Sequence, residues 1–196
     1  MEFTVEDGCC FTTINGTRGT LSQACVQSLI EATKDLGSDA KYIETGSYLG
    51  CSSLIVALHS NAIVYAHDIW VTDWSELKGS PPPEVKDYFY TFYDMVKKNK
   101  MTRRIIPIRG NSVYTLGIHD DDSIDVAFID GDHSLDGCFL DLEAVFPKMK
   151  KNGKILIHDC YGDNECRQAV LKFVAKHSLK NIKDIPYSCG MVLIEL

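Results

Sequence analysis

The sequence has no long apolar run, no Cys-x-x-Cys pair and no excess of positive charge, and each absence excludes a class of protein. No apolar stretch approaches the length that crosses a bilayer, and the N-terminus lacks the basic and apolar segments of a secretory signal. The formal net charge of −7 at pH 7 argues against nucleic acid as the main partner, because phosphate binding requires a basic surface. We therefore expect a cytoplasmic protein that binds neither a membrane nor nucleic acid.

The eight cysteines are scattered, and several fall in apolar patterns where a free thiol behaves as a small hydrophobic side chain. Their spacing gives neither a zinc nor a dithiol motif, so we expect reduced thiols. A chain of 196 residues is long enough for one domain with a substantial core. The sequence leaves both a monomer and a homo-oligomer open.

Short apolar runs alternate with amphipathic segments along most of the chain. The periodicity predicts helices at 22–36, 84–100, 135–150 and 165–177, and strands at 41–44, 63–67, 105–108, 124–129, 154–157, 182–185 and 191–195. A Pro186/Gly190 turn joins the last two strands as a hairpin. This order predicts an α/β fold with a doubly wound, mostly parallel seven-stranded Rossmann-like sheet and an antiparallel C-terminal strand. Residues 1–20 have no firm periodicity, so we expect 1–39 to form a helical lead-in to a main domain at 40–196.

The stretch from Glu44 to Ser53 has the pattern of a buried strand, a glycine-containing turn and the start of a helix. Gly46 and Gly50 let the backbone approach a ligand, and the helix N-terminus offers N–H groups to an anion. The spacing lacks the third glycine of the dinucleotide fingerprint. A tight turn without a ligand is therefore an equally good interpretation of the glycines alone.

A second acidic residue, Asp68, ends the next predicted strand, about 20 residues beyond the loop, where a carboxylate can bind a ribose diol. The following stretch, 69–83, contains both tryptophans and three consecutive prolines. It is either a surface loop with an apolar anchor or a lid, with Trp70 near a nucleoside base.

Polar groups follow every predicted parallel strand. In a doubly wound sheet, ligands bind beyond the carboxyl ends of the strands, so these groups would gather at one rim. They are Glu44, Asp68, Asn111-Ser112, Asp130-Gly131-Asp132-His133 and His158-Asp159.

Four segments together resemble class I S-adenosylmethionine-dependent methyltransferases, in the branch of small-molecule O-methyltransferases of the macrocin and cephalosporin type, and more distantly the catechol type. The segments are 44–53, 67–70, 128–133 and 153–159, and the string Asp130–His133 with its following helix is the most specific. The resemblance spans roughly residues 40–196. It implies that this part is an S-adenosylmethionine-binding methyltransferase domain acting on a hydroxylated small molecule.

The resemblance also assigns cofactor contacts residue by residue. It implies that the methionine part of the cofactor is lined by Glu44, Gly46, Gly50, Ser47, Tyr48 and Ser52. It also implies that the ribose hydroxyls bind to Asp68 and that the adenine lies near Ile69, Trp70, Asn111 and Ser112. The sulfonium would lie beside Asp130.

Two catalytic arrangements follow from the resemblance. In one, Asp130 and Asp159, with His158 or water, bind Mg²⁺ or another divalent ion that lowers the pKa of a substrate hydroxyl. Metal-dependent relatives have oxygen ligands at both positions after the strand, whereas this chain has a histidine at 158, which Mg²⁺ disfavours. In the other, no metal is needed, and His158 or His133 acts as a general base beside Asp130, with a near-neutral pKa.

Two other functions remain open at this point. A nicotinamide-dependent oxidoreductase also uses a glycine turn and a ribose acid. A non-catalytic adenosyl-binding module would keep the fold and bind the cofactor without turnover.

Overall fold

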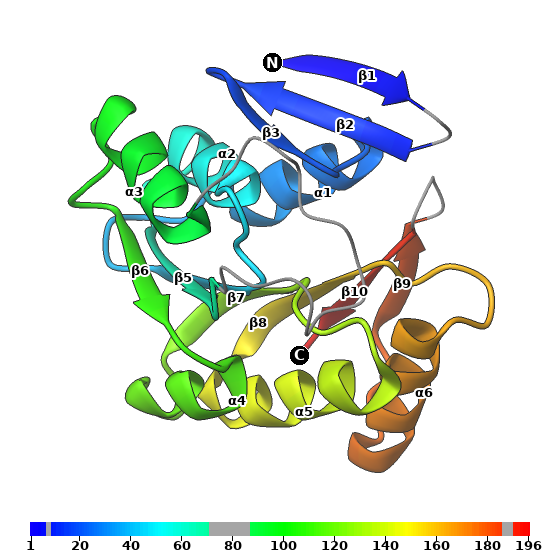
Figure 1. Cartoon of the computed structure of the whole chain (residues 1–196). Helices are drawn as coiled ribbons and strands as arrows, with labels where there is room; N and C mark the ends of the chain where they lie inside the picture. The colour runs from blue at the N-terminus through cyan, green and yellow to red at the C-terminus, as the bar shows by residue number, and fades with distance from the viewer. Residues whose placement is uncertain (7–8, 71–86, 186–189) are drawn as a thin grey trace.

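The structure is a computed structural model that describes residues 1–6, 9–70, 87–185 and 190–196. In Figure 1 a central sheet lies between two layers of helices, and a small separate sheet lies above the upper layer. The upper layer consists of α1 (Gln23–Thr33), α2 (Cys51–His59) and α3 (Tyr88–Lys98). The lower layer consists of α4 (Ser112–Thr115), α5 (Leu135–Val145) and α6 (Glu165–His177).

The central sheet has seven strands in the order β6-β5-β4-β7-β8-β10-β9. They are β4 (Lys41–Thr45), β5 (Ile63–Asp68), β6 (Ile105–Arg109), β7 (Ile124–Ile129), β8 (Met149–His158), β9 (Ile182–Ile185) and β10 (Met191–Glu195). The pairs from β6 through to β8 are parallel, whereas β10 is antiparallel to both β8 and β9. The predicted doubly wound sheet with an antiparallel C-terminal strand is therefore confirmed.

The core is divided by this sheet into two apolar clusters, as expected when helices cover both faces. The upper cluster joins α1, α2 and α3 to the sheet through residues such as Leu29, Leu54 and Phe92, each fully buried. The lower cluster joins α5 and α6 through Leu142 and Phe173. Side chains on both faces of β4 and β7 are therefore buried, which explains the apolar run Val126–Ile129 in β7.

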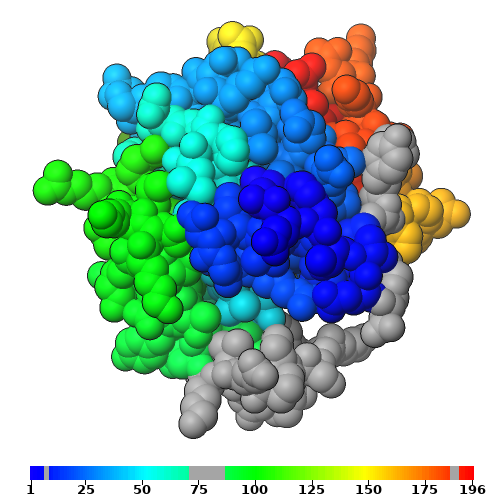
Figure 2. Space-filling model, turned by 90° about the horizontal axis from the view of Figure 1, so that it is seen from above, coloured from blue at the N-terminus to red at the C-terminus, as the bar shows by residue number. Residues whose placement is uncertain are grey.

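The expected helical lead-in is partly wrong, because its first half is a sheet. Strands β1 (Glu2–Glu6), β2 (Cys9–Ile14) and β3 (Thr17–Gly19) pair antiparallel, and only then does α1 begin, capped by Ser22. Thr12 is buried in this sheet and donates its hydroxyl to the carbonyl of Leu21 at 2.6 Å. Figure 2 shows these residues, in dark blue, lying across the centre of the upper face.

The helix expected at 135–150 is shorter. Regular α-helix ends at Val145, residues Phe146–Lys148 form a 3₁₀ turn, and β8 already begins at Met149. Pro147 explains the change, because it has no N–H to continue the helical hydrogen bonding. The proposed lid at 69–83 lies outside the described residues from position 71 onward, as does most of the Pro186/Gly190 turn.

None of the helices in the described part of the chain has the length and apolar character needed to span a bilayer. The seven cysteines within the described ranges are free thiols, five of them buried. This agrees with the expectation of reduced thiols for those seven positions.

Candidate functional site

The carboxyl ends of β4, β5, β7 and β8 lie side by side at one rim of the sheet. Thr45 on β4 is paired in register with His67 on β5 and Ile129 on β7, and Ile129 is paired in turn with Ile157 on β8. The residues that follow these positions therefore emerge next to one another. The polar strand ends that the sequence singled out do gather at this rim.

The glycine turn lies directly against the segment that follows β7. Gly46 has φ 78°, and a Cβ added to it would lie 1.9 Å from the carbonyl oxygen of Asp130. Any side chain here would force the two segments apart, so the glycine is required by this contact. The turn assigned to the cofactor and the acidic residue assigned to the sulfonium are therefore in van der Waals contact.

Gly50 has a different structural role. It has φ 87°, and a Cβ there would meet Met95 Cε at 2.1 Å and the Phe92 ring at 2.9 Å. The close approach of α3 is therefore sufficient to explain this glycine. Its assignment to the cofactor stays a prediction.

Glu44 is fully buried among hydroxyl groups at the end of β4. Its carboxylate accepts hydrogen bonds from Ser53, at the start of α2, and from Tyr42, whose hydroxyl lies 3.0 Å away. Burial raises the pKa of Glu44, while the hydroxyls of Ser53, Ser47 and Ser52 oppose that rise. This network fixes the turn between β4 and α2 and places Ser47 and Ser52 beneath it.

Asp68 closes the turn from the neighbouring strand. Its two carboxylate oxygens accept hydrogen bonds from the backbone N–H of Tyr48, at 2.7 Å, and of Trp70, at 2.6 Å. Burial raises the pKa of Asp68, and these two backbone bonds oppose that rise. Asp68 therefore holds the glycine turn in place, and each oxygen keeps a second lone pair for a further donor.

Trp70 packs its indole ring into the protein. The side chain is 2% exposed, its ring centroid lies 4.8 Å from that of Phe92, and its Nε1 donates to the Tyr48 carbonyl at 2.8 Å. Ile69 beside it is 38% exposed and faces solvent. Of Ile69 and Trp70, two of the four residues assigned to the adenine, only Ile69 therefore presents an open side chain in this structure.

Asn111 and Ser112, the other two residues assigned to the adenine, begin α4. Asn111 caps the helix by accepting a hydrogen bond from the N–H of Val113, at 3.0 Å. Ser112 donates its hydroxyl to Asp141 Oδ1 on α5, at 2.5 Å. Both side chains are therefore engaged in holding the start of α4.

Two aspartates and two histidines meet beyond β7 and β8, and we call them the four-residue cluster: Asp130, His133, His158 and Asp159. Asp130 Oδ1 lies 3.2 Å from His158 Nδ1 and 3.3 Å from His133 Nε2. Asp159 Oδ2 lies 3.5 Å from His158 Nδ1 and 3.4 Å from His133 Nδ1. Each carboxylate thus contacts both imidazoles. The three residues predicted to be catalytic, Asp130, His133 and His158, are brought together.

The two histidines differ in access. The His133 side chain is 53% exposed, whereas that of His158 is 3% exposed. A ligand at the rim can therefore touch His133 but not His158. The buried His158 Nδ1 lies close enough to both carboxylates for an electrostatic contact but makes no hydrogen bond of good geometry with either.

The pKa values of the cluster follow from these contacts. The hydrogen bond to Asp130 raises the pKa of His133 to about 9. Burial disfavours a charged His158, but the charge of Asp130 outweighs burial and raises the pKa of His158. Burial also opposes ionisation of Asp130, yet His158 and His133 lower its pKa. The expected near-neutral pKa of a general base is therefore wrong for the ligand-free cluster, because the aspartates stabilise both imidazolium ions.

The set of residues that could bind a metal differs in one residue from the set that the sequence indicated. Asp130, His133 and Asp159 each offer a ligand atom, and these atoms lie within 4.8 Å of one another. Within the described ranges this is the group suited to a metal ion, and it contains His133 where the sequence favoured His158. Two carboxylates and an imidazole fit a transition metal such as Mn²⁺ or Fe²⁺ better than Mg²⁺, which prefers oxygen ligands alone.

One structural residue of the site was missed by the sequence analysis. Asp141 lies under the rim, 2% exposed, on the face of α5 that also buries Cys138, Leu142 and Val145. A carboxylate in an apolar helical stripe was the signal that could have identified it, because ionisable groups are rarely buried without a partner.

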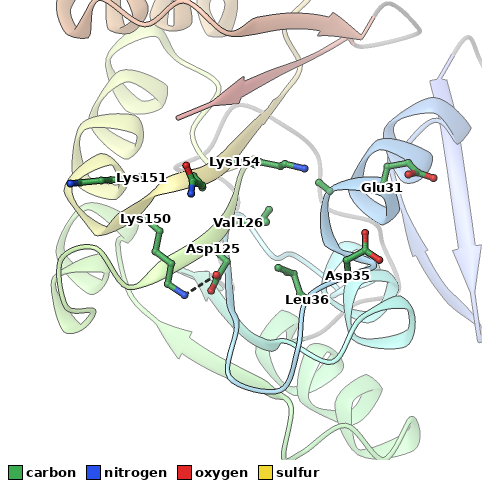
Figure 3. Close-up of a pocket in the computed structure, with 11 residues that line it drawn as sticks. Glu31, Asp35, Leu36, Asp125, Val126, Lys150, Lys151 and Lys154 are labelled. Carbon is green, nitrogen blue, oxygen red and sulfur yellow. Dashed lines mark hydrogen bonds and ion pairs between the residues drawn. The ribbon is translucent and has the colours of Figure 1, made fainter.

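A separate groove of about 410 Å³ lies at the opposite edge of the sheet (Figure 3). Its lining carries both signs of charge, with Glu31 and Asp35 on one side and Lys151 and Lys154 on the other, while Lys150 and Asp125 are paired at 2.8 Å. This groove lies at the amino ends of β7 and β8, away from the residues gathered at the rim.

Comparison with known proteins agrees with this geometry. No curated protein matches the chain by sequence. The O-methyltransferase NovP has a similar structure, with a TM-score of 0.69 and 15% identity, over 90% of this chain and 81% of that one. A methyltransferase from Geobacter sulfurreducens has a TM-score of 0.63 and 16% identity, over 89% and 79%. At these identities the likeness concerns the fold.

A putative methyltransferase from Streptococcus mutans, solved in complex with S-adenosylhomocysteine, gives a TM-score of 0.65 at 13% identity, over 89% of this chain and 98% of that one. A family model described as a methyltransferase domain matches residues 43–160, a span that runs from the glycine turn to the end of the four-residue cluster. Because that match covers more than half of the chain, the protein belongs to the methyltransferase domain family.

Proposed function

We propose that the protein transfers the methyl group of S-adenosylmethionine to a hydroxyl group of a small molecule. One observation carries this proposal: the glycine turn and the four-residue cluster are in direct contact, through Gly46 and the carbonyl of Asp130. A cofactor held by the turn would therefore present its sulfonium next to side chains that can receive a proton. Methyl transfer to oxygen needs that combination, because the hydroxyl proton must leave as the new C–O bond forms.

The chain's own residues supply the binding surface. Asp68 has lone pairs available for the ribose hydroxyls beyond its two backbone hydrogen bonds. The N-terminus of α2 follows Gly50 directly and offers its N–H groups to the methionine carboxylate. S-adenosylmethionine carries the reactive methyl group, so the protein has to orient the two reactants and exclude water.

His133 is the residue that we assign to proton removal, because it is the accessible histidine of the cluster. The substrate hydroxyl takes the place of one of its carboxylate contacts and transfers its proton to the ring nitrogen. A sulfonium beside Asp130 is a positive charge, which lowers the pKa of a neighbouring imidazolium. Cofactor binding would in this way bring His133 from its ligand-free pKa of about 9 toward neutrality.

The same side chains would hold a divalent ion if one is part of the enzyme. Asp130, His133 and Asp159 are the ligands that fit, and the ion would lower the pKa of the substrate hydroxyl. In that case the ion takes over the role assigned to His133.

The alternatives make different predictions. Membership of the methyltransferase domain family argues against a nicotinamide-dependent oxidoreductase. A non-catalytic adenosyl-binding module would bind the cofactor but show no turnover with hydroxylated acceptors such as sugars or phenols. Binding and turnover must therefore be measured separately.

The first test is calorimetric titration of S-adenosylhomocysteine into the wild-type protein and into Asp68→Ala, with Asp39→Asn as an exposed carboxylate control. We expect binding to wild type and to the control, and its loss in Asp68→Ala. A thermal shift with S-adenosylhomocysteine but not with NADH would support the same conclusion. Absence of binding to the wild-type protein would exclude the methyltransferase proposal.

The second test is transfer of a labelled methyl group from S-adenosylmethionine to a panel of phenols and sugars. Turnover that disappears in His133→Asn supports the assigned role. Binding without turnover on any hydroxylated acceptor would favour the non-catalytic module.

A further inference from the structure

We infer that Asp141 is a positioning residue, whose buried carboxylate holds the end of β4, the turn after β7 and the start of α4 together beneath the cofactor rim. It contacts the rim segments from below and is itself closed to a ligand, since it lies on the second turn of α5 with 2% of its surface exposed. The expected effect of Asp141 on cofactor binding rests on the proposed function, whereas its contacts with the three segments do not depend on that function.

One oxygen of Asp141 holds α4. Oδ1 accepts the hydroxyl hydrogen of Ser112 at 2.5 Å, a short distance that is typical of a strong bond to a carboxylate. Ser112 is the first residue of α4, which follows β6 and carries the polar group at that strand's end. The contact therefore ties the start of α4 to α5.

The other oxygen, Oδ2, faces the end of β4 and the segment that follows β7. A Cβ added to Gly131 would lie 2.9 Å from Asp141 Oδ2 and 3.3 Å from Thr45 Oγ1. Gly131 thus rests on the carboxylate with no room for a side chain. Thr45, the last residue of β4, is fully buried beside it and accepts the N–H of Asp130 at its carbonyl, at 3.0 Å.

Asp141 therefore stands under three rim segments at once. The glycine turn and Asp130 are packed so closely that a Cβ on Gly46 would have no space beside the Asp130 carbonyl. A shift of the supporting segments would therefore change the position of Asp130 relative to the turn. A carboxylate at this place is costly. Burial raises the pKa of Asp141, and the hydrogen bond from Ser112 acts against that rise, whereas Oδ2 has no hydrogen-bond partner in the described structure.

The stability of the fold alone does not explain why a carboxylate stands at position 141. Leucine has a similar length and would fill the stripe of Cys138, Leu142 and Val145 without the cost of burying a carboxylate, and this gain opposes the loss of the acceptor for the Ser112 hydroxyl. The hydrogen bond from the Ser112 hydroxyl is the contact of Asp141 that leucine cannot replace. This difference separates a positioning role from a packing role.

The test uses the full chain and four variants: Asp141→Leu, Asp141→Asn, Ser112→Ala and the control Asp136→Leu. Asp136 is an exposed carboxylate in the first turn of the same helix. Hydrogen–deuterium exchange is measured on the cofactor-free proteins in peptides that cover 109–116 and 128–133. Affinity for S-adenosylhomocysteine and the melting temperature are measured on the same samples.

We expect both peptides to exchange faster in Asp141→Leu while its melting temperature stays near that of wild type. Asp141→Asn keeps an acceptor for Ser112, so it should exchange at an intermediate rate, and Ser112→Ala should loosen 109–116 only. Affinity for S-adenosylhomocysteine should fall about tenfold in Asp141→Leu, the scale of one lost hydrogen bond to a charged group. Asp136→Leu should match wild type in all three measurements.

Unchanged exchange in both peptides of Asp141→Leu would overturn the inference. If Asp141→Leu fails to fold, the exchange of peptide 109–116 in Asp141→Asn and Ser112→Ala decides instead. Unchanged exchange of that peptide in both variants would then overturn the inference. Faster exchange with unchanged affinity would refute the link to the cofactor rim. If wild type binds no S-adenosylhomocysteine, the proposed function fails, and the exchange rates still decide whether Asp141 positions the three segments.

Discussion

Acid should destabilise this protein through a buried histidine pair on β5 and the turn after α4. His67 is fully buried, with Nδ1 2.8 Å from Thr115 Oγ1 and Nε2 3.0 Å from Nε2 of His119. Two imidazoles that face each other cannot both carry a charge in such a place. Burial, assisted by His119, lowers the pKa of His67 from 6.5 to about 3.

The sign and size of the effect follow from that shift. A histidine with a lowered pKa binds fewer protons in the folded than in the unfolded state. Its contribution is therefore complete above pH 6.5 and is lost as the pH falls toward 3. From pH 6.5 to pH 5 the loss is 1.5 pH units at about 1.4 kcal/mol each, or about 2 kcal/mol for His67 alone.

The assay is urea denaturation at pH 7, 6 and 5, followed by tryptophan fluorescence, for wild type and His67→Gln. The variant should be less stable at pH 7, but its free energy of unfolding should fall by about 2 kcal/mol less on acidification. Other titrating groups are shared by the two proteins and cancel in the difference. The control is His59→Gln, which removes an exposed histidine and should keep the wild-type pH dependence. Equal pH dependence in wild type and His67→Gln would refute the reasoning.

Three further predictions concern the rim. Gly46→Ala should lower the free energy of unfolding by about 3 kcal/mol or more, because alanine is strained at a positive φ and its Cβ would clash with the Asp130 carbonyl. Gly37→Ala should leave the free energy of unfolding unchanged, because the space around Gly37 is open. Denaturant unfolding measures both values. The value of kcat/KM for S-adenosylmethionine should rise with pH toward about 9, because His133 must lose its proton in the cofactor-free enzyme, and a flat profile from pH 7 to 9.5 would contradict this role. Mn²⁺ should bind more tightly than Mg²⁺ in calorimetry and lose its affinity in Asp159→Ala; tighter Mg²⁺ binding would argue against the mixed ligand set.

The main sheet could be predicted because its signals are local. The apolar runs of β7 and β8 are buried on both faces, and a polar residue follows each of them, whereas β4 is marked by its buried Tyr42 and Ile43 and by the glycine turn after it. The N-terminal sheet gives a weaker signal, since β1 has five residues, all exposed, and β2 buries only Thr12 and Ile14 of its six residues. Its position depends on packing against the rest of the protein, which periodicity does not report.

The sequence could predict which residues gather at the site, but not the direction in which their side chains point. Strand ends placed Asp130, His133, His158 and Asp159 together, since parallel strands share one carboxyl edge. Which histidine is accessible depends on side-chain direction and on neighbouring helices. The raised pKa of His133 likewise depends on the distance to Asp130, which no spacing in the sequence specifies.

The position of β10 has a consequence for the order in which the fold can form. β10 comes last in the chain but lies between β8 and β9, and its Met191, Val192 and Ile194 are buried. β9 has no other strand to pair with in the described sheet, so it cannot join until β10 is available. During synthesis, which proceeds from the N-terminus, β9 must therefore leave the ribosome without a pairing partner, and that edge of the sheet closes only once residues 191–195 have emerged.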